Sequence, residues 1–179
     1  MIKLHLGCGS RYIEGFVHID LIENEHVDYL TSIDNLFMYK DNSVDMIYCS
    51  HVLEHFKKNQ IPDVLNEWYR VLKPEGLLRL SVPDFEKLVK VYRKYKDLKL
   101  IIGPLYGRQD YEYNIHYTTF DYPSLYAALE KAGFKNIRRY DWRETEHSHI
   151  DDYSQAYIPH MDKENGTMIS LNIEADKHW

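Results

Sequence analysis

Two short apolar runs near the amino terminus, residues 2–7 and 16–20, limit most strongly what this chain can fold into. The first run alternates in a way that predicts a strand, and it leads into Gly7-Cys8-Gly9. These glycines let the chain turn sharply and let backbone amides approach a ligand. The second run predicts another strand and ends in Asp20, whose carboxylate can accept both hydroxyl hydrogens of a ribose. The pair indicates a strand edge at which a nucleoside cofactor binds.

The spacing at this edge differs from that of a dinucleotide-binding fingerprint. That fingerprint has a third glycine three residues after the second, and an acidic residue about 20 residues further on. Here Tyr12 occupies the third position, and Asp20 follows Gly9 by only eleven residues. A pyrophosphate would have no cradle, so the spacing disfavours a nicotinamide-dependent oxidoreductase and points to S-adenosylmethionine. For the glycines alone, a plain structural turn is the alternative.

Two further segments complete a resemblance to a known family. Residues 44–49 predict a buried strand that runs through Ser50 into His51-Val52-Leu53-Glu54-His55, and Arg70-Val71-Leu72-Lys73-Pro74-Glu75-Gly76 ends a predicted helix. With Leu6-Gly7-Cys8-Gly9 and Ile19-Asp20, these segments make the chain resemble a class I S-adenosylmethionine-dependent methyltransferase of the small type 11 kind. The resemblance covers most of the chain and extends to methyltransferases of sugar- and glycan-modifying pathways.

The alternation of predicted strands and helices, together with this resemblance, implies an α/β fold. We expect a Rossmann-like, doubly wound sheet of seven mostly parallel strands with an antiparallel hairpin at one edge. Only six residues separate Gly9 from the second strand, so the first helix of the fold should be shortened or lost. The dipole of that helix would then be weakened or lost as well. We expect one domain, residues 1–179, with lid regions near 103–122 and 143–167. Expected strands are 2–7, 16–20, 27–30, 44–49, 77–82, 136–142 and 168–175, and expected helices are 59–73, 85–97 and 123–132.

The resemblance places the adenine pocket in the loop after the third strand. An acidic residue there would accept the adenine amino hydrogens, and Asp34 is the acidic side chain available. An apparent one-residue insertion near residues 37–39 leaves Ser32 as the alternative, and Asp34 can equally cap the turn. Phe37 or Ile33 would cover one face of the adenine. The expected cofactor-binding residues are Gly7, Cys8, Gly9, Asp20, Leu21, Ser32, Ile33, Asp34, Ser50 and His51.

Methyl transfer requires an acceptor aligned with the methyl carbon, and an aliphatic hydroxyl is helped by a general base. We expect His116 to be that base, because by resemblance its loop covers the acceptor. His51 is second, because it follows a strand at the expected cofactor edge. Asp84 also follows a strand whose end lines the ligand crevice. For each histidine, a structural hydrogen bond is the alternative.

Residues 146–162 lie between the last two predicted strands and are dense in polar, tyrosine and apolar side chains, which predicts a folded segment. His147, His149, Asp151 and Asp152 superficially resemble a divalent metal motif. The matching motif needs another histidine where Asp152 stands, so we expect no metal and a lid over a polyhydroxylated acceptor. The alternative is an internal network that pins the segment to the sheet. The expected substrate-binding residues are Arg108, Gln109, His149, Asp152 and Gln155.

The composition of the chain limits the kinds of partner that it is expected to bind. The net charge of −6 argues against nucleic acid, which requires clustered Lys and Arg. No apolar run approaches the roughly 20 residues of a membrane span, and with two cysteines a disulfide or zinc site is not expected, so we expect a cytoplasmic protein. Sixteen tyrosines suit the stacking of sugar rings.

Together, these features predict an enzyme that uses S-adenosylmethionine to methylate a sugar hydroxyl, whether free, nucleotide-linked or at a glycan end, and that releases S-adenosylhomocysteine. Two alternatives stay open. One is a small-molecule N- or C-methyltransferase, and the other is a cofactor-binding, non-catalytic partner of a glycosyltransferase. The sequence leaves the acceptor and the oligomeric state open.

Overall fold

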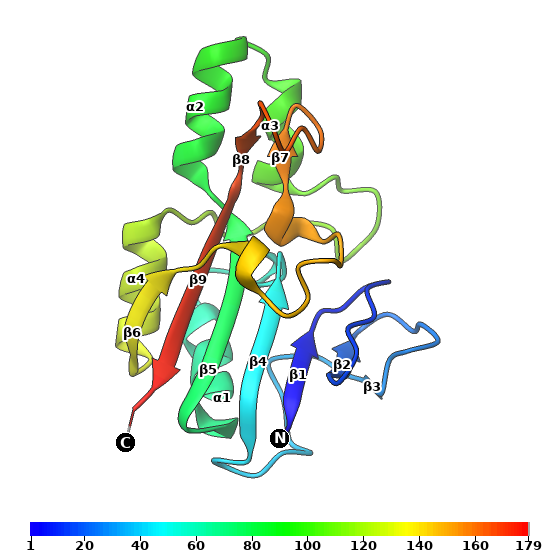
Figure 1. The fold of residues 1–179 in the computed structure, drawn as a ribbon, viewed down its shortest axis with the longest axis vertical. Coiled ribbons are helices and arrows are strands. Elements are labelled where there is room, and N and C mark those ends of the chain that lie inside the picture. The colour runs from blue at the N-terminus through cyan, green and yellow to red at the C-terminus, as the bar shows by residue number, and fades with distance from the viewer. Residues whose placement is uncertain (179) are drawn as a thin grey trace.

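The computed structural model describes residues 1–178 and contains a seven-stranded sheet in the order β3-β2-β1-β4-β5-β9-β6 (Figure 1). Strands β1 to β5 pair in parallel, whereas β9 runs antiparallel to both neighbours, β5 and β6. This arrangement confirms the expected Rossmann-like fold. The strands of the sheet are β1 (Lys3–Leu6), β2 (Val17–Asp20), β3 (Tyr29–Leu30), β4 (Val44–Ser50), β5 (Leu72–Pro83), β6 (Phe134–Arg139) and β9 (Ser170–Lys177).

Helices and a small second sheet complete the chain. The helix at 99–106 was not expected, because it contains Gly103 and Pro104, which disfavour a helix interior. It is held by apolar packing against the preceding helix, through Leu88, Val91 and Ile101. The helices are α1 (Ile61–Val71), α2 (Phe85–Tyr95), α3 (Lys99–Tyr106) and α4 (Tyr122–Lys131), with 3-10 turns at Leu53–His55, Trp142–Glu144 and Tyr153–Gln155, and β7 (Tyr157–Ile158) pairs with β8 (Thr167–Met168). No helix within residues 1–178 has the length and apolarity needed to cross a membrane.

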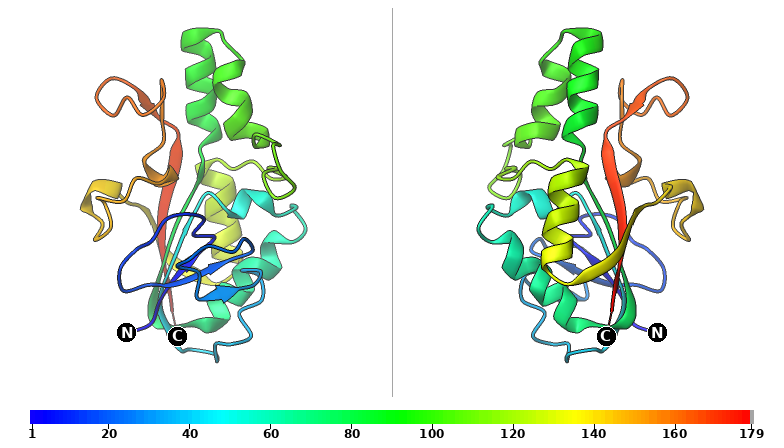
Figure 2. Two further views of the ribbon diagram at one scale, coloured as in Figure 1. Left: turned by 90° about the vertical axis from the view of Figure 1, so that its right-hand side faces the viewer. Right: turned by 90° about the vertical axis from the view of Figure 1, so that its left-hand side faces the viewer.

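One face of the sheet is covered by α1 and α4 (Figure 2). Helix α1 buries Ile61, Val64, Leu65, Trp68 and Val71, the spacing of a single helical stripe. These residues pack on apolar side chains of alternate positions in the strands. The buried indole of Trp68 donates its N–H to the carbonyl of residue 33 at 2.9 Å, so its polar atom is satisfied.

The opposite face is covered mostly by irregular chain, which contains the 3-10 turns at Trp142–Glu144 and Tyr153–Gln155, as both views in Figure 2 show for the segment at 140–158. Within the described residues, no helix lies between β1 and β2, which confirms that the first helix of the fold is lost. Ile13 and Phe16 from that connection pack with Met46 and Tyr48 of β4, and Ile150 of the later segment joins them. This face therefore depends on contacts between distant parts of the chain.

Candidate active site

A cavity of about 460 Å³ opens at the carboxyl ends of β1, β2 and β4. Two segments that enter from elsewhere, one before α4 and one between β6 and β9, complete its walls. Nine of the ten expected cofactor-binding residues line it, and the exception is Asp34, which is exposed on the neighbouring turn. The cavity is lined by His5, Gly7, Cys8, Gly9, Arg11, Asp20, Leu21, Ile22, Ser32, Ile33, Ser50, His51, Val52, His55, Phe56, Tyr111, Glu112, Tyr113, Tyr117, Asp152 and Tyr153.

The glycine loop is shaped by close approach and by Asp20. A Cβ on Gly7 would lie 2.3 Å from a methyl group of Val52, and the positive φ of +64° also disfavours a side chain. Gly9 also has a positive φ, but a Cβ there would meet no atom within 4 Å, so its open side faces free space. The Asp20 carboxylate accepts hydrogen bonds from the amides of Gly9 at 2.7 Å and Ile22 at 2.8 Å. Asp20 thus orders the loop and, at 9% exposure, still reaches the cavity.

Cys8 contributes little reactivity to this loop. Its side chain is 3% exposed and forms no disulfide. Burial, reinforced by the negative charge of Asp20, raises the pKa of the Cys8 thiol to about 12. The thiol therefore stays protonated near neutral pH, and Cys8 acts as a small buried side chain beside the cavity.

Among the described residues that line the cavity, Arg11 is the only lysine or arginine. Its Nε donates to the carbonyl of Asp151 at 2.9 Å, and its guanidinium lies 5.9 Å from the ring of Tyr153. Sequence reasoning missed this residue, because its place at the cavity depends on a contact with Asp151, 140 residues further along the chain. Arg11 also joins the amino-terminal loop to the segment between β6 and β9.

His51 follows β4 and lines the cavity, as expected. Its Nε2 lies 2.8 Å from the hydroxyl oxygen of Ser170, and that hydroxyl is already used in a hydrogen bond to the carbonyl of Tyr153. The proton on this imidazole therefore lies on Nε2, and Nδ1 carries the lone pair. Burial, followed by the nearby His116 and His55, lowers the pKa of His51 to about 3, so the ring is neutral near pH 7.

A carboxylate that sequence reasoning did not assign lies behind His51. Glu54 is 1% exposed, and neither of its carboxylate oxygens has a hydrogen-bond partner among the residues that the structure describes. Its Oε1 lies 3.5 Å from Nδ1 of His51 and 3.9 Å from Nε2 of His116. The rings of His55 and His116 are perpendicular, with centroids 4.7 Å apart. Of these four residues, His51 and His55 reach the cavity, and His116 lies just behind its wall.

The two regions expected to form lids both contribute to the cavity, although few of the expected substrate-binding residues do. Tyr111, Tyr113 and Tyr117 come from the first region, and Asp152 with Tyr153 from the second. Three expected substrate-binding residues, Arg108, Gln109 and His149, are exposed outside the cavity. A fourth, Gln155, donates to the carbonyls of residues 148 and 150 and accepts from Lys163. Asp84, which was expected to be catalytic, caps α2 instead.

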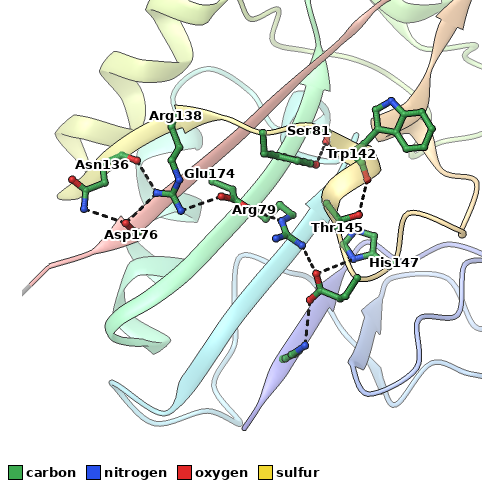
Figure 3. Close-up of polar contacts among 12 residues, drawn as sticks. Arg79, Ser81, Asn136, Arg138, Trp142, Thr145, His147, Glu174 and Asp176 are labelled. Carbon is green, nitrogen blue, oxygen red and sulfur yellow. Dashed lines mark hydrogen bonds and ion pairs between the residues drawn. The ribbon is translucent and has the colours of Figure 1, made fainter. Parts of the chain in front are cut away.

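The segment between β6 and β9 is bound to polar side chains on the face of the sheet opposite α1 and α4, called the polar face below. Arg79 of β5 binds Glu146 at 2.7 Å and Glu174 at 2.8 Å, and Figure 3 shows it between the segment and β9. Lys3 of β1 also binds Glu146, at 3.2 Å. Nearer the cavity, the buried hydroxyl of Tyr48 donates to Asp152 at 2.5 Å. These contacts hold the cavity wall against β1, β4 and β5.

Comparisons with known proteins agree with this geometry. Residues 14–80 match the family described as "Methyltransferase domain" (Methyltransf_11). A search of curated proteins finds no match to this chain. Among solved structures, a SAM-dependent methyltransferase from Archaeoglobus fulgidus is similar, with 19% identity, a TM-score of 0.64 and coverage of 98% of this chain and 85% of that one.

Two further structures have the same fold. A possible histamine N-methyltransferase from Thermotoga maritima has 18% identity and a TM-score of 0.61, with 98% of this chain and 82% of that one covered. The 1,6-didemethyltoxoflavin-N1-methyltransferase of Burkholderia thailandensis, solved with S-adenosylhomocysteine, has 16% identity and a TM-score of 0.58, with 99% and 71% covered. Residues 14–80 thus match a methyltransferase domain, and the chain shares the fold of solved S-adenosylmethionine-dependent methyltransferases.

Proposed function

We propose that this enzyme methylates a hydroxyl group of a sugar, free, nucleotide-linked or at the end of a glycan. The observation that carries the proposal is that the two segments that complete the cavity wall contribute several tyrosines to it. Tyr111, Tyr113, Tyr117 and Tyr153 line that wall, and aromatic faces with polar tips suit the C–H faces and hydroxyl edges of sugar rings.

The cofactor would lie along the carboxyl ends of the strands. In this proposal Asp20, with the adjacent Leu21, binds the ribose hydroxyls, and Ile33 covers the adenine. Ser32 rather than Asp34 would bind the adenine edge, because Ser32 lines the cavity and Asp34 is not among its lining residues. The methionine end would lie against Gly7, Cys8 and Gly9, with Arg11 binding its carboxylate in place of the missing helix dipole, and the methyl group would point toward Ser50 and His51.

The reaction forms one bond and breaks one. The acceptor oxygen attacks the methyl carbon, and the electron pair of the carbon–sulfur bond stays on sulfur, which gives S-adenosylhomocysteine. The hydroxyl proton would move to His51, which lines the cavity and whose Nδ1 carries a lone pair. We prefer His51 to His116 as the base, because His116 lies behind the wall.

The first test is calorimetric titration of the protein with S-adenosylhomocysteine, with NAD as a control. We expect micromolar binding of S-adenosylhomocysteine and none of NAD. Asp20→Ala should weaken binding by about 1.5–3 kcal/mol, since it removes charge-assisted hydrogen bonds to the ribose and the bond that orders Gly9. Unchanged affinity in a folded Asp20→Ala protein would remove the ribose assignment.

The acceptor is tested next, with labelled S-adenosylmethionine and a panel of sugars, nucleotide sugars and small amines. We expect an O-methyl product from the sugar class. A product methylated on nitrogen would favour the small-molecule alternative, in line with the names of two of the structural neighbours. No product from any acceptor, despite tight cofactor binding, would favour a non-catalytic partner.

A further inference from the structure

Glu54, His55 and His116 form a cluster behind His51. It brings several hydrogen-bond acceptor atoms together without a donor between them. Glu54, His55 and His116 each offer one ligating atom, and these atoms lie within 4.8 Å of one another. Glu54 is the centre of the cluster, and both of its buried oxygens lack a partner. An unpartnered buried carboxylate is costly, so its presence calls for a cation or a proton.

The hydrogen bonds of the histidines fix where their protons are. Nδ1 of His55 lies 3.0 Å from the carbonyl oxygen of Ile115, and Nδ1 of His116 lies 2.9 Å from that of Pro104. A carbonyl only accepts, so both protons are on Nδ1 and both Nε2 atoms carry lone pairs. This is the arrangement of metal-binding histidines, whose second nitrogen donates to a backbone carbonyl or carboxylate. The Nε2 of His116 faces Oε1 of Glu54.

The geometry points to a divalent transition-metal site formed by Glu54, His55 and His116, at the wall of the cavity. Two imidazoles and one carboxylate suit ions such as Mn²⁺, Co²⁺ and Zn²⁺, and they leave coordination positions open. The sequence led us to expect no metal, and the only motif considered there was the separate one around His147 and His149.

The catalytic role of this ion rests on the proposed function. An aliphatic hydroxyl holds its proton about as tightly as water, whose pKa of about 15.7 falls to about 7 on a zinc ion. An acceptor hydroxyl bound to the ion would release its proton to His51 or to solvent, and the resulting oxygen would attack the methyl carbon. The ion changes neither its charge nor its oxidation state.

The binding test needs neither cofactor nor acceptor. Tag-free protein is treated with chelator and then titrated with Co²⁺, whose visible absorption reports its ligands. We expect one equivalent to bind to the wild type. Glu54→Gln and His116→Ala should each weaken binding by on the order of 100-fold or more, since even the loss of an outer-shell partner costs about 10–100-fold. The control is His149→Ala, which removes an exposed imidazole and should bind Co²⁺ like the wild type.

The rival explanation is a proton on Glu54 with no metal, because burial raises the pKa of this carboxyl to about 8. No Co²⁺ binding by the wild type, or equal binding by Glu54→Gln, would overturn the metal site. Loss of binding in His149→Ala alone would also overturn it and move the ion to the other motif. Circular dichroism and binding of S-adenosylhomocysteine confirm that each variant is folded.

A second measurement separates this inference from the proposed function. Chelator should stop methyl transfer to any acceptor found, and Mn²⁺ or Co²⁺ should restore it in the wild type but not in Glu54→Gln. Full activity in chelator would overturn the catalytic role of the ion. If Co²⁺ binding depends on Glu54 and no sugar is methylated, the metal site stands and the proposed acceptor falls.

Discussion

The two faces of the sheet use the same strands but contrasting side chains. Toward α1 and α4, alternate strand positions are aliphatic and pack into one apolar cluster. Toward the segment at 140–158, the intervening positions include His5, Tyr48, Arg79 and Asn172, which are held by ion pairs, ring contacts and hydrogen bonds. The helix-covered face follows from local periodicity, whereas the polar face depends on partners far along the chain. The polar face should therefore respond to pH and to the loss of single polar groups.

The helix-covered face should show the largest loss on truncation. Trp68→Ala removes a fully buried indole and its hydrogen bond to the carbonyl of residue 33. We expect the free energy of unfolding to fall by about 3–5 kcal/mol, with an unchanged pH dependence. Urea denaturation at two pH values measures both. A loss below about 1 kcal/mol would mean that this face is not the main source of stability.

On the polar face, Arg79 is the critical ion-pair partner. Its side chain is 11% exposed, and Arg79→Met leaves Glu174 and Glu146 short of a partner. We expect a loss of about 2–4 kcal/mol, and faster hydrogen exchange in residues 142–158 than in α1. Arg138→Met is the matched control, because Arg138 also binds Glu174 but is 45% exposed, and it should cost less than about 1 kcal/mol. Equal effects from the two variants would contradict this interpretation.

Acid should weaken the polar face selectively. Burial, then His18, His147 and His26, lowers the pKa of His5 to about 3 from its usual 6.5. Between these values the unfolded chain binds a proton that the folded chain excludes, so stability is full above pH 6.5 and falls as the pH drops toward 3. For His5 alone, the loss by pH 5 is about 2 kcal/mol.

His5→Phe tests this directly. Nδ1 of His5 has no hydrogen-bond partner, so an apolar ring loses little. The fall in stability between pH 7 and pH 5 should be about 2 kcal/mol smaller in the variant. His147, whose pKa is lowered to about 4 by burial, and His18, which is paired with Asp28, remain to titrate. An unchanged pH profile would show that His5 is not excluded from protonation.

The smallest expected effect concerns the cavity itself. Arg11→Gln should weaken S-adenosylhomocysteine by about 1–2 kcal/mol if the guanidinium binds the methionine carboxylate. Binding of 5′-methylthioadenosine, which has no carboxylate, should not change. Calorimetry with both ligands makes the comparison, and equal weakening of the two would mean that Arg11 only holds the loop in place.

The fold was readable from sequence because its signals are local. Alternation and glycine turns lie within a few residues of one another, and they predicted the parallel sheet and the loss of the first helix. The predicted helix end at Pro74 to Gly76 was wrong, because α1 ends at Val71 and β5 begins at Leu72, which pairs with Val44 of β4. Helix α3 was missed because Gly103 and Pro104 obscure it, and only packing against α2 offsets them.

The site was only partly predictable. Positions at strand ends, such as Asp20 and His51, follow from the fold, and the structure brings both to the cavity. The closeness of Glu54 to His116 does not follow from the fold, because it depends on how the chain from α2 to residue 120 returns to the sheet. The neighbourhood of Lys3 and Glu146 spans 143 residues, beyond any local pattern. The functions of all these side chains stay predictions.

The position of β9 has a consequence for how the protein matures during its synthesis. This strand is made after both of its neighbours, yet it inserts between β5 and β6, and its Ser170 bonds to His51 at the cavity. Tyr153 and Asp152, which close the cavity wall, emerge shortly before it. A nascent chain therefore has neither a closed sheet nor a complete cavity until β9 has been made, so cofactor binding cannot guide the folding of the strands that precede β9.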